Sequence, residues 1–166
     1  MWKKIVPVIF IFYIFVLLQN SFFNHFSLFG VAPNLVFTLF FLLVFFSPSK
    51  LEVILLAVIA GFFIDIFSYT YVGPSIILLI ILSILLKKVL SSLKNTAESY
   101  PFIYFLPLFV IFLLAYILLK DLYLYFLDPN KMVINLSLNI IYSLVYSSIF
   151  ATAFFFIYKR WLKFTK

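Results

Sequence analysis

Long apolar runs separated by short polar segments cover almost the whole chain. A membrane crossing needs about 20 apolar residues, and runs of this order predict helices at 5–22, 32–47, 51–68, 74–90, 101–119 and 133–158. Four residues, 47–50, separate the second run from the third, and a turn at 68–73 separates the third from the fourth. Such short connections predict antiparallel helical hairpins. We therefore predict an all-α integral membrane protein, a six-transmembrane-helix bundle that forms one domain over residues 1–166.

The composition is not that of a soluble globular protein. The chain is 67% hydrophobic and 10% charged, with a mean hydropathy of +1.27. A soluble surface needs about 25–35% charged residues, so the expected solvent for this surface is the lipid bilayer. The absence of cysteine excludes disulfides, thiol catalysis and cysteine-bound metals.

The basic residues predict the orientation of the bundle. With the N-terminus inside, ten of the 12 Lys and Arg residues fall in cytoplasmic segments, namely Lys3, Lys4, Lys50, Lys87, Lys88, Lys94, Lys159, Arg160, Lys163 and Lys166. The outer segments hold Lys120 and Lys131. Such a bias places both termini in the cytoplasm. Because topology alone accounts for the net charge of +7, we expect no nucleic-acid partner.

The third run carries an acidic residue inside an apolar segment. Asp65 follows Ala57 and Gly61 at intervals of four and precedes Ser68 by three, so the four residues share one helix face. Small residues on such a face allow another backbone to approach closely. A carboxylate in this environment costs several kcal/mol unless it is paired or hydrated.

The turn after Asp65 offers a partner for its charge. Gly73 and Pro74 form the start of the next helix, with Pro74 at a favourable first helical position. The first N–H groups of a helix lack partners and carry partial positive charge. We therefore expect Asp65 to accept hydrogen bonds from these N–H groups.

The last run carries a second polar stripe. Asn135, Asn139, Tyr142 and Tyr146 recur at intervals of four, three and four, which places them on one helix face. We expect this face to contact protein, because amides directed at lipid lack hydrogen-bond partners. Three interpretations stay open: contacts within the bundle, a solute pocket, and a docking face for another protein's helix.

Reactive side chains are scarce. The single histidine, His25, has neither a second histidine nor a nearby carboxylate in the sequence, which argues against a metal site or a catalytic base there. The single arginine, Arg160, follows the last apolar run. We expect no enzymatic activity, no cofactor and no metal. We interpret the 25 phenylalanines mainly as lipid-facing bulk.

Several motifs together resemble the rod shape-determining protein MreD family of bacteria. They are Leu18-Gln19 at the end of the first helix, Gly30-Val-Ala-Pro33-Asn34-Leu35 at the start of the second, and Gly61-Phe-Phe-Ile-Asp65-Ile-Phe-Ser68 followed by Gly73. Asn34 stands where that family often has aspartate. The resemblance covers about residues 1–90 by motif and the rest by topology.

The resemblance implies a fold and a partner. The fold is similar to the substrate-binding S components of energy-coupling-factor transporters. The implied function is that of a non-catalytic scaffold in the bacterial inner membrane, which binds the single-span protein MreC within the cell-elongation machinery. This complex influences cell shape and peptidoglycan synthesis through a penicillin-binding transpeptidase and its glycosyltransferase partner. We expect a partner helix to dock at Gly61 or at Asn139. The oligomeric state, including a homo-oligomer, stays open.

A transporter component is the alternative. S components of vitamin transporters have the same predicted architecture and resemble one another in an Ala-xxx-Ala pattern on the first helix. Here the segment from Ile5 to Leu18 contains no alanine. The connection at 68–73 is also short for a loop that closes a solute pocket.

Overall fold

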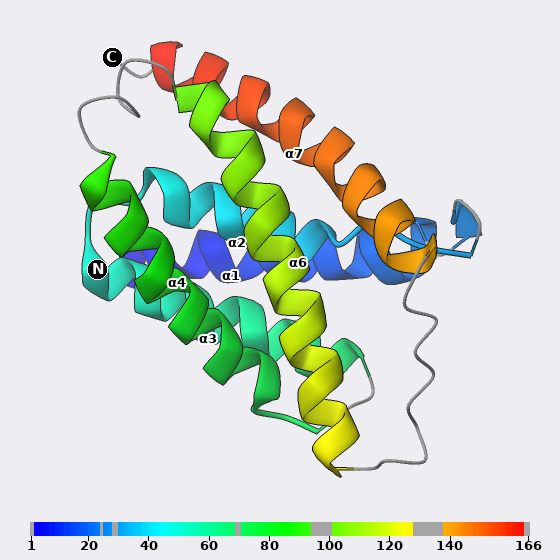
Figure 1. The fold of residues 1–166 in the computed structure, drawn as a ribbon. Coiled ribbons are helices and arrows are strands. Elements are labelled where there is room, and N and C mark those ends of the chain that lie inside the picture. The colour runs from blue at the N-terminus through cyan, green and yellow to red at the C-terminus, as the bar shows by residue number, and fades with distance from the viewer. Residues whose placement is uncertain are drawn as a thin grey trace.

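The computed structural model of the chain describes residues 2–23, 25–27, 30–68, 71–93, 101–127 and 138–164 (Figure 1). These residues form a helical bundle. Its elements are α1 (Trp2–Leu17), the π-helical segment η1 (Leu18–Phe23), α2 (Leu35–Phe46), α3 (Lys50–Phe67), α4 (Pro74–Ser92), α6 (Pro101–Leu127) and α7 (Leu138–Phe164).

The helix boundaries agree with the predicted runs at most ends and differ at two. α6 continues to Leu127, eight residues beyond the predicted end at 119, and α7 continues to Phe164. Lys120 and Asp121 mark where a hydrocarbon span stops, but charged residues do not remove backbone hydrogen bonds as proline does. The helix therefore continues past them. Residues 133–137 of the last predicted run lie outside the described residues.

The structure is that of a multi-pass membrane protein. Four helical spans in the described residues are long and apolar enough to cross a membrane, and they are Ile5–Phe23, Pro74–Ser92, Pro101–Tyr123 and Leu138–Arg160. α3 has 18 residues but carries three charges, at Lys50, Glu52 and Asp65. α2 has 12 residues, which corresponds to about 18 Å, and this is shorter than the hydrocarbon layer of about 30 Å.

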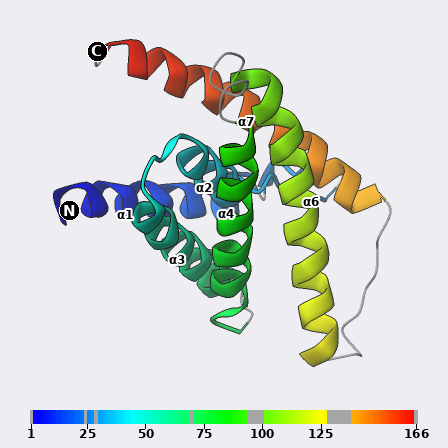
Figure 2. The same ribbon diagram turned by 60° about the vertical axis from the view of Figure 1, so that its left-hand side comes forward.

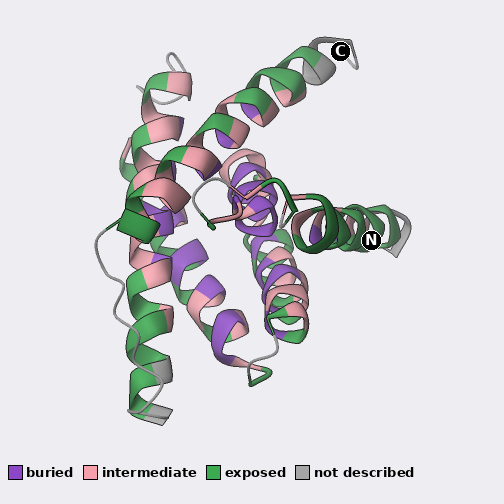
Figure 3. Ribbon diagram, turned by 90° about the vertical axis from the view of Figure 1, so that its right-hand side faces the viewer, coloured by how far each residue is buried: buried purple, intermediate pink, exposed green. Residues whose placement is uncertain are grey.

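α2 lies at the centre of the bundle. It packs against α1, α3, α4, α6 and α7, and most of its residues are buried (Figure 3). α2 is apolar on all sides, which is the pattern of a helix enclosed by other helices. The start of α1 and the end of α7 lie on the same side of the bundle in two views (Figures 1 and 2).

α3 and α4 approach each other closely at Gly61. α3 packs most extensively against α4. A Cβ atom added at Gly61 lies 2.5 Å from Ile76 Cα and 2.6 Å from Ile76 N. Because this space is filled by backbone, α4 approaches α3 at a distance that any side chain at position 61 prevents.

Phenylalanines fill the core between α2, α6 and α7. Phe41 of α2 contacts Phe105 and Phe109 of α6, with ring centroids 5.5 and 5.4 Å apart. Phe105 in turn lies 4.8 Å from Phe155 of α7. All four side chains are buried. The interpretation of phenylalanine as mainly lipid-facing is therefore wrong for this cluster, because rings that interlock between helices fill space that smaller side chains leave open.

The end of α2 is held by a lysine of α4. Lys87 Nζ donates a hydrogen bond to the carbonyl oxygen of Ser47, the C-terminal cap of α2. The Ser47 hydroxyl donates to Glu52 Oε2 at 3.0 Å. A cation beside the negative end of a helix is electrostatically favourable. The two hydrogen bonds of Ser47 therefore connect α2, α3 and α4 at one end of the bundle.

Enlarging Gly61 tests the close approach of α3 and α4. We expect Gly61→Leu to lower the free energy of unfolding by about 3 kcal/mol, because the new side chain displaces the backbone of Ile76. Val58→Leu is the matched control, since Val58 lies on the exposed side of the same helix. The measurement is denaturant unfolding in mixed micelles. Equal stability of the two variants contradicts the packing described.

Candidate functional site

The carboxylate of Asp65 caps the start of α4. Asp65 is 0% exposed. Its Oδ2 atom accepts a hydrogen bond from Gly73 N at 2.7 Å, and Ser75 N lies 3.2 Å from both carboxylate oxygens. These contacts confirm the prediction that Asp65 accepts hydrogen bonds from the N–H groups at this turn.

Local sequence explains the geometry of this cap. Gly73 has φ +125°, which other residues rarely adopt, and Pro74 is the first residue of α4. Because proline has no N–H, the available donors are those of the residues on either side of it. The negative carboxylate then lies at the positive end of the α4 dipole, where it is stabilised without a cation.

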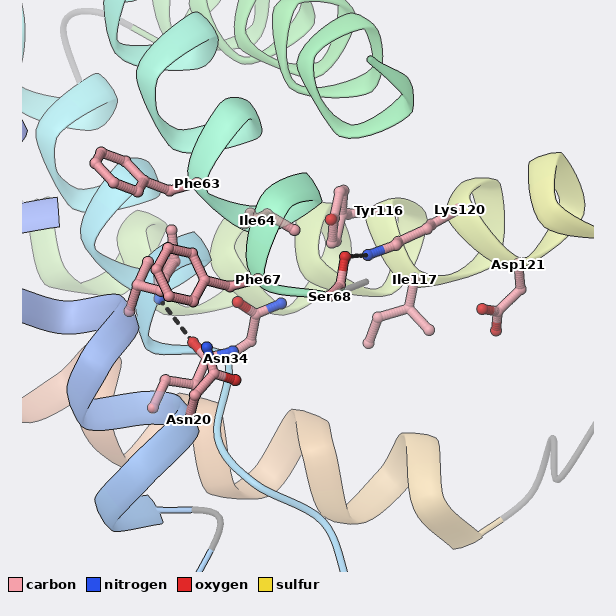
Figure 4. Close-up of a pocket in the computed structure, with 13 residues that line it drawn as sticks. Asn20, Asn34, Phe63, Ile64, Phe67, Ser68, Tyr116, Ile117, Lys120 and Asp121 are labelled. Carbon is pink, nitrogen blue, oxygen red and sulfur yellow. Dashed lines mark hydrogen bonds between the residues drawn. The ribbon is translucent and has the colours of Figure 1, made fainter. Parts of the chain in front are cut away.

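Two further contacts connect this cap to α6. The hydroxyls of Ser75 and Tyr116 are 3.0 Å apart and both residues are buried. Lys120 Nζ lies 3.5 Å from Ser68 Oγ (Figure 4). The sequence interpretation missed Ser75 and Tyr116. The four-residue spacing of Tyr116 and Lys120, which places them on one face of α6, was the available signal.

Amides cap the start of α2 in a similar way. Asn34 Oδ1 accepts a hydrogen bond from Phe37 N at 3.1 Å, and Gln19 Oε1 accepts one from Val36 N at 3.2 Å. Asn34 N donates to Ser147 Oγ of α7 at 2.9 Å. Together these contacts fix η1, α2 and α7 at one point. Ser147 was also missed, because no pattern in the sequence relates it to a turn 113 residues away.

A cavity of about 300 Å³ separates the two caps. The ends of α1 and α3, the start of α2 and one face of α6 surround it (Figure 4). Its polar lining comprises Gln19, Asn20, Asn34, Ser68, Tyr116, Lys120 and Asp121, and its apolar lining comprises Val16, Val36, Phe63, Ile64, Phe67 and Ile117.

No family model, curated protein or solved structure matches the chain. Three backbone N–H contacts occupy the oxygens of Asp65, so this carboxylate has the environment of a structural cap rather than that of a general base, which needs access to a substrate proton.

The small-residue face of α3 is occupied by the protein's own α4. Ala57, Gly61 and Asp65 are buried, and the nearest backbone to Gly61 is that of Ile76. Ser68 ends the face and is exposed. The expectation that a partner helix docks at Gly61 is wrong in this fold, because α4 fills the space that the small residues leave.

The structure separates the polar stripe of the last run. Asn135 lies outside the described residues, Asn139 is exposed, and Tyr142 is half-buried. The Tyr146 hydroxyl donates to the carbonyl oxygen of Phe26 at 3.3 Å. Tyr146 therefore holds the segment after η1 against α7, while Asn139 stays at the surface.

Replacing Asp65 tests the cap of α4. We expect Asp65→Ala to lower the free energy of unfolding by about 3 kcal/mol, because two backbone N–H groups lose their acceptor. Asp65→Asn keeps one acceptor oxygen, so about half of that loss is expected. Glu52→Ala is the control. Glu52 is an exposed carboxylate on the same helix that accepts a surface hydrogen bond from Ser47, so its loss should cost less than about 1 kcal/mol. Equal stability of all three variants in micelle denaturation contradicts the cap.

The hydroxyl pair of Ser75 and Tyr116 is tested by a double-mutant cycle. Tyr116→Phe leaves the Ser75 hydroxyl without its partner and should cost about 1 kcal/mol. Ser75→Ala should cost a similar amount, and the double variant should cost less than the sum of both. Strict additivity of the three unfolding free energies contradicts a direct contact.

Proposed function

We propose that the chain is a non-catalytic scaffold of the MreD type in the bacterial inner membrane. In this role it binds an MreC-like single-span protein and takes part in the control of cell shape and peptidoglycan synthesis. A penicillin-binding transpeptidase and its glycosyltransferase partner are the further expected members of the assembly. In this proposal the bundle acts through its surfaces.

The use of the motif residues supports this proposal. Gln19 and Asn34, from two of the motifs, cap α2, and Asp65 and Gly73, from the third, cap α4. The motifs that resemble the MreD family therefore meet around one cavity and fix the helices that surround it. Side chains whose hydrogen bonds hold helix ends in place favour a structural role for these motifs over a catalytic one.

The finer topology is part of the proposal. α3 corresponds to about 27 Å, and its charges lie in its first and last turns, so it completes a crossing. α2 together with the preceding segment 30–34 forms the remaining one. Six crossings with both termini in the cytoplasm, in an arrangement similar to an S component, agree with the basic residues counted above. A reporter fused after Lys166 that is active outside the cell contradicts this topology.

A transporter component is the second candidate, and the cavity is the observation that favours it. Its volume of about 300 Å³ lies at the lower end of the range for small-molecule sites. The lack of alanine between Ile5 and Leu18 argues against it, because that pattern serves docking to the transport module. Large thermal stabilisation by one compound of a vitamin panel, without a single-span partner in pull-downs, would favour the transporter.

Asn139 is the remaining candidate for partner docking. It is exposed near the start of α7, and small or polar residues on such surfaces allow helices to approach and bond. Co-purification tests this surface together with the scaffold function. A tagged chain extracted from native membranes should retain a single-span protein with a coiled-coil segment.

A bulky residue at position 139 should prevent this association. We expect Asn139→Trp to reduce the co-purified partner at least about tenfold, which corresponds to a loss of about 1.4 kcal/mol in binding. Ile141→Trp, exposed on another side of α7, is the matched control and should retain the partner. Loss in both variants, or in neither, contradicts docking at Asn139. Failure of the unaltered chain to retain any single-span protein contradicts the scaffold function.

A further inference from the structure

The cavity between the two caps presents hydrogen-bond donors. The side-chain oxygens of Gln19 and Asn34 accept backbone N–H groups of α2. An amide group that accepts through its oxygen keeps two N–H donors on its nitrogen. Both residues line the cavity, and in the part of the chain that the structure describes, their NH₂ groups have no acceptor.

Lys120 adds a positive charge to the same space. Its ammonium group has three donors, and its one hydrogen bond to the described residues is the 3.5 Å contact with Ser68 Oγ. Asn34 and Lys120 extend into the cavity from opposite sides (Figure 4). The cavity thus holds a cation with unused donors opposite amide donors.

Two carboxylates, Asp65 and Asp121, lie near enough to attract this cation, but in the described residues neither forms a hydrogen bond with it. The oxygens of Asp65 are engaged by Gly73 N and Ser75 N. Asp121 also lines the cavity, but it is exposed, and in Figure 4 its carboxylate lies farther along α6 than the Lys120 ammonium. One cation next to an exposed carboxylate favours an anion with a single charge over one with two.

The remaining wall of the cavity is apolar. Phe63 and Phe67 of α3 lie on one side of it (Figure 4), and Val16 of α1 and Ile117 of α6 contribute further apolar surface. A ligand that satisfies both parts of the lining has a charged group that accepts hydrogen bonds and an apolar body. This combination describes an amphiphile.

We propose that this cavity binds the singly charged oxyanion, a phosphodiester or a carboxylate, of an amphiphilic molecule. The oxyanion contacts Lys120 and the amide nitrogens of Gln19 and Asn34, and the apolar body lies along Phe63 and Phe67. A phospholipid headgroup and a water-soluble amphiphile share this chemistry. The proposal is independent of the scaffold function, which partner co-purification tests separately.

Thermal unfolding in an uncharged maltoside detergent tests the proposal. The lipid probes are phosphatidylglycerol and, as a reference with acyl chains and no phosphate, diacylglycerol. The soluble probes are glycerophosphoglycerol and hexanoate. We expect at least one oxyanion probe to raise the unfolding midpoint to a saturating value, whereas diacylglycerol has no such effect. An effect of phosphatidylglycerol alone identifies a lipid site, and an effect of the soluble probes identifies a site for a molecule from water.

Variants connect the shift to Lys120. Lys120→Met should weaken binding of the active probe about tenfold, because a hydrogen bond to a charged group is lost, and Lys120→Arg should largely retain it. Lys88→Met, an exposed lysine of α4, is the matched control. Asn20 also lines the cavity, beside Asn34 (Figure 4). Asn20→Leu should weaken binding because it replaces a polar group near the bound oxyanion with an apolar one, and this variant applies if the Lys120 variants fail to fold. Native mass spectrometry of the same samples counts bound lipid.

Three results overturn the proposal. The first is the absence of a midpoint shift with every oxyanion probe. The second is an equal shift with diacylglycerol and phosphatidylglycerol, which indicates binding through acyl chains alone. The third is an unchanged response of the cavity variants, Lys120→Met and Asn20→Leu, relative to Lys88→Met.

Discussion

The contact between the Asp65 carboxylate and the start of α4 is the constraint around which the bundle is arranged. A backbone N–H group without a partner costs several kcal/mol where water is absent, and the first residues of α4, Pro74 and Ser75, are buried. Asp65 satisfies Gly73 N and Ser75 N together. It reaches them because Gly61, one helical turn earlier on the same face, brings the α4 backbone into contact with α3.

The N–H groups at the start of α2 also need acceptors, and here side-chain amides supply them in place of a carboxylate. Asn34 and Gln19 accept hydrogen bonds from the first N–H groups of this short central helix. Lys87 donates a hydrogen bond to a carbonyl oxygen at its other end. α2 is therefore held at its start by its own N-cap, Asn34, and by Gln19 of η1, and at its end by Lys87 of α4. Between these polar ends, interlocked phenylalanines fill the core.

Capping also determines the character of the cavity between α1, α2, α3 and α6. Gln19 and Asn34 line it, and their amide oxygens are used by backbone N–H groups, so these two side chains offer N–H donors to the cavity. In the described residues, the polar side chains at the two caps are used to hold helix ends. This arrangement agrees with the scaffold and with the oxyanion site, both of which are proposals.

The class of the fold and the cap at Asp65 can both be read from the amino-acid sequence. Apolar runs of membrane length reveal helices without tertiary information, and Asp65 and Ser75 are 10 residues apart, so helix geometry and one turn bring them together. Which face of each apolar helix points inward depends on how the helices pack together. A helix that is apolar on all sides gives no periodic signal for its buried face. For that reason the burial of phenylalanines, the occupation of the Gly61 face by α4, and the contacts of Ser147 and Tyr116 across 113 and 41 residues came from the fold.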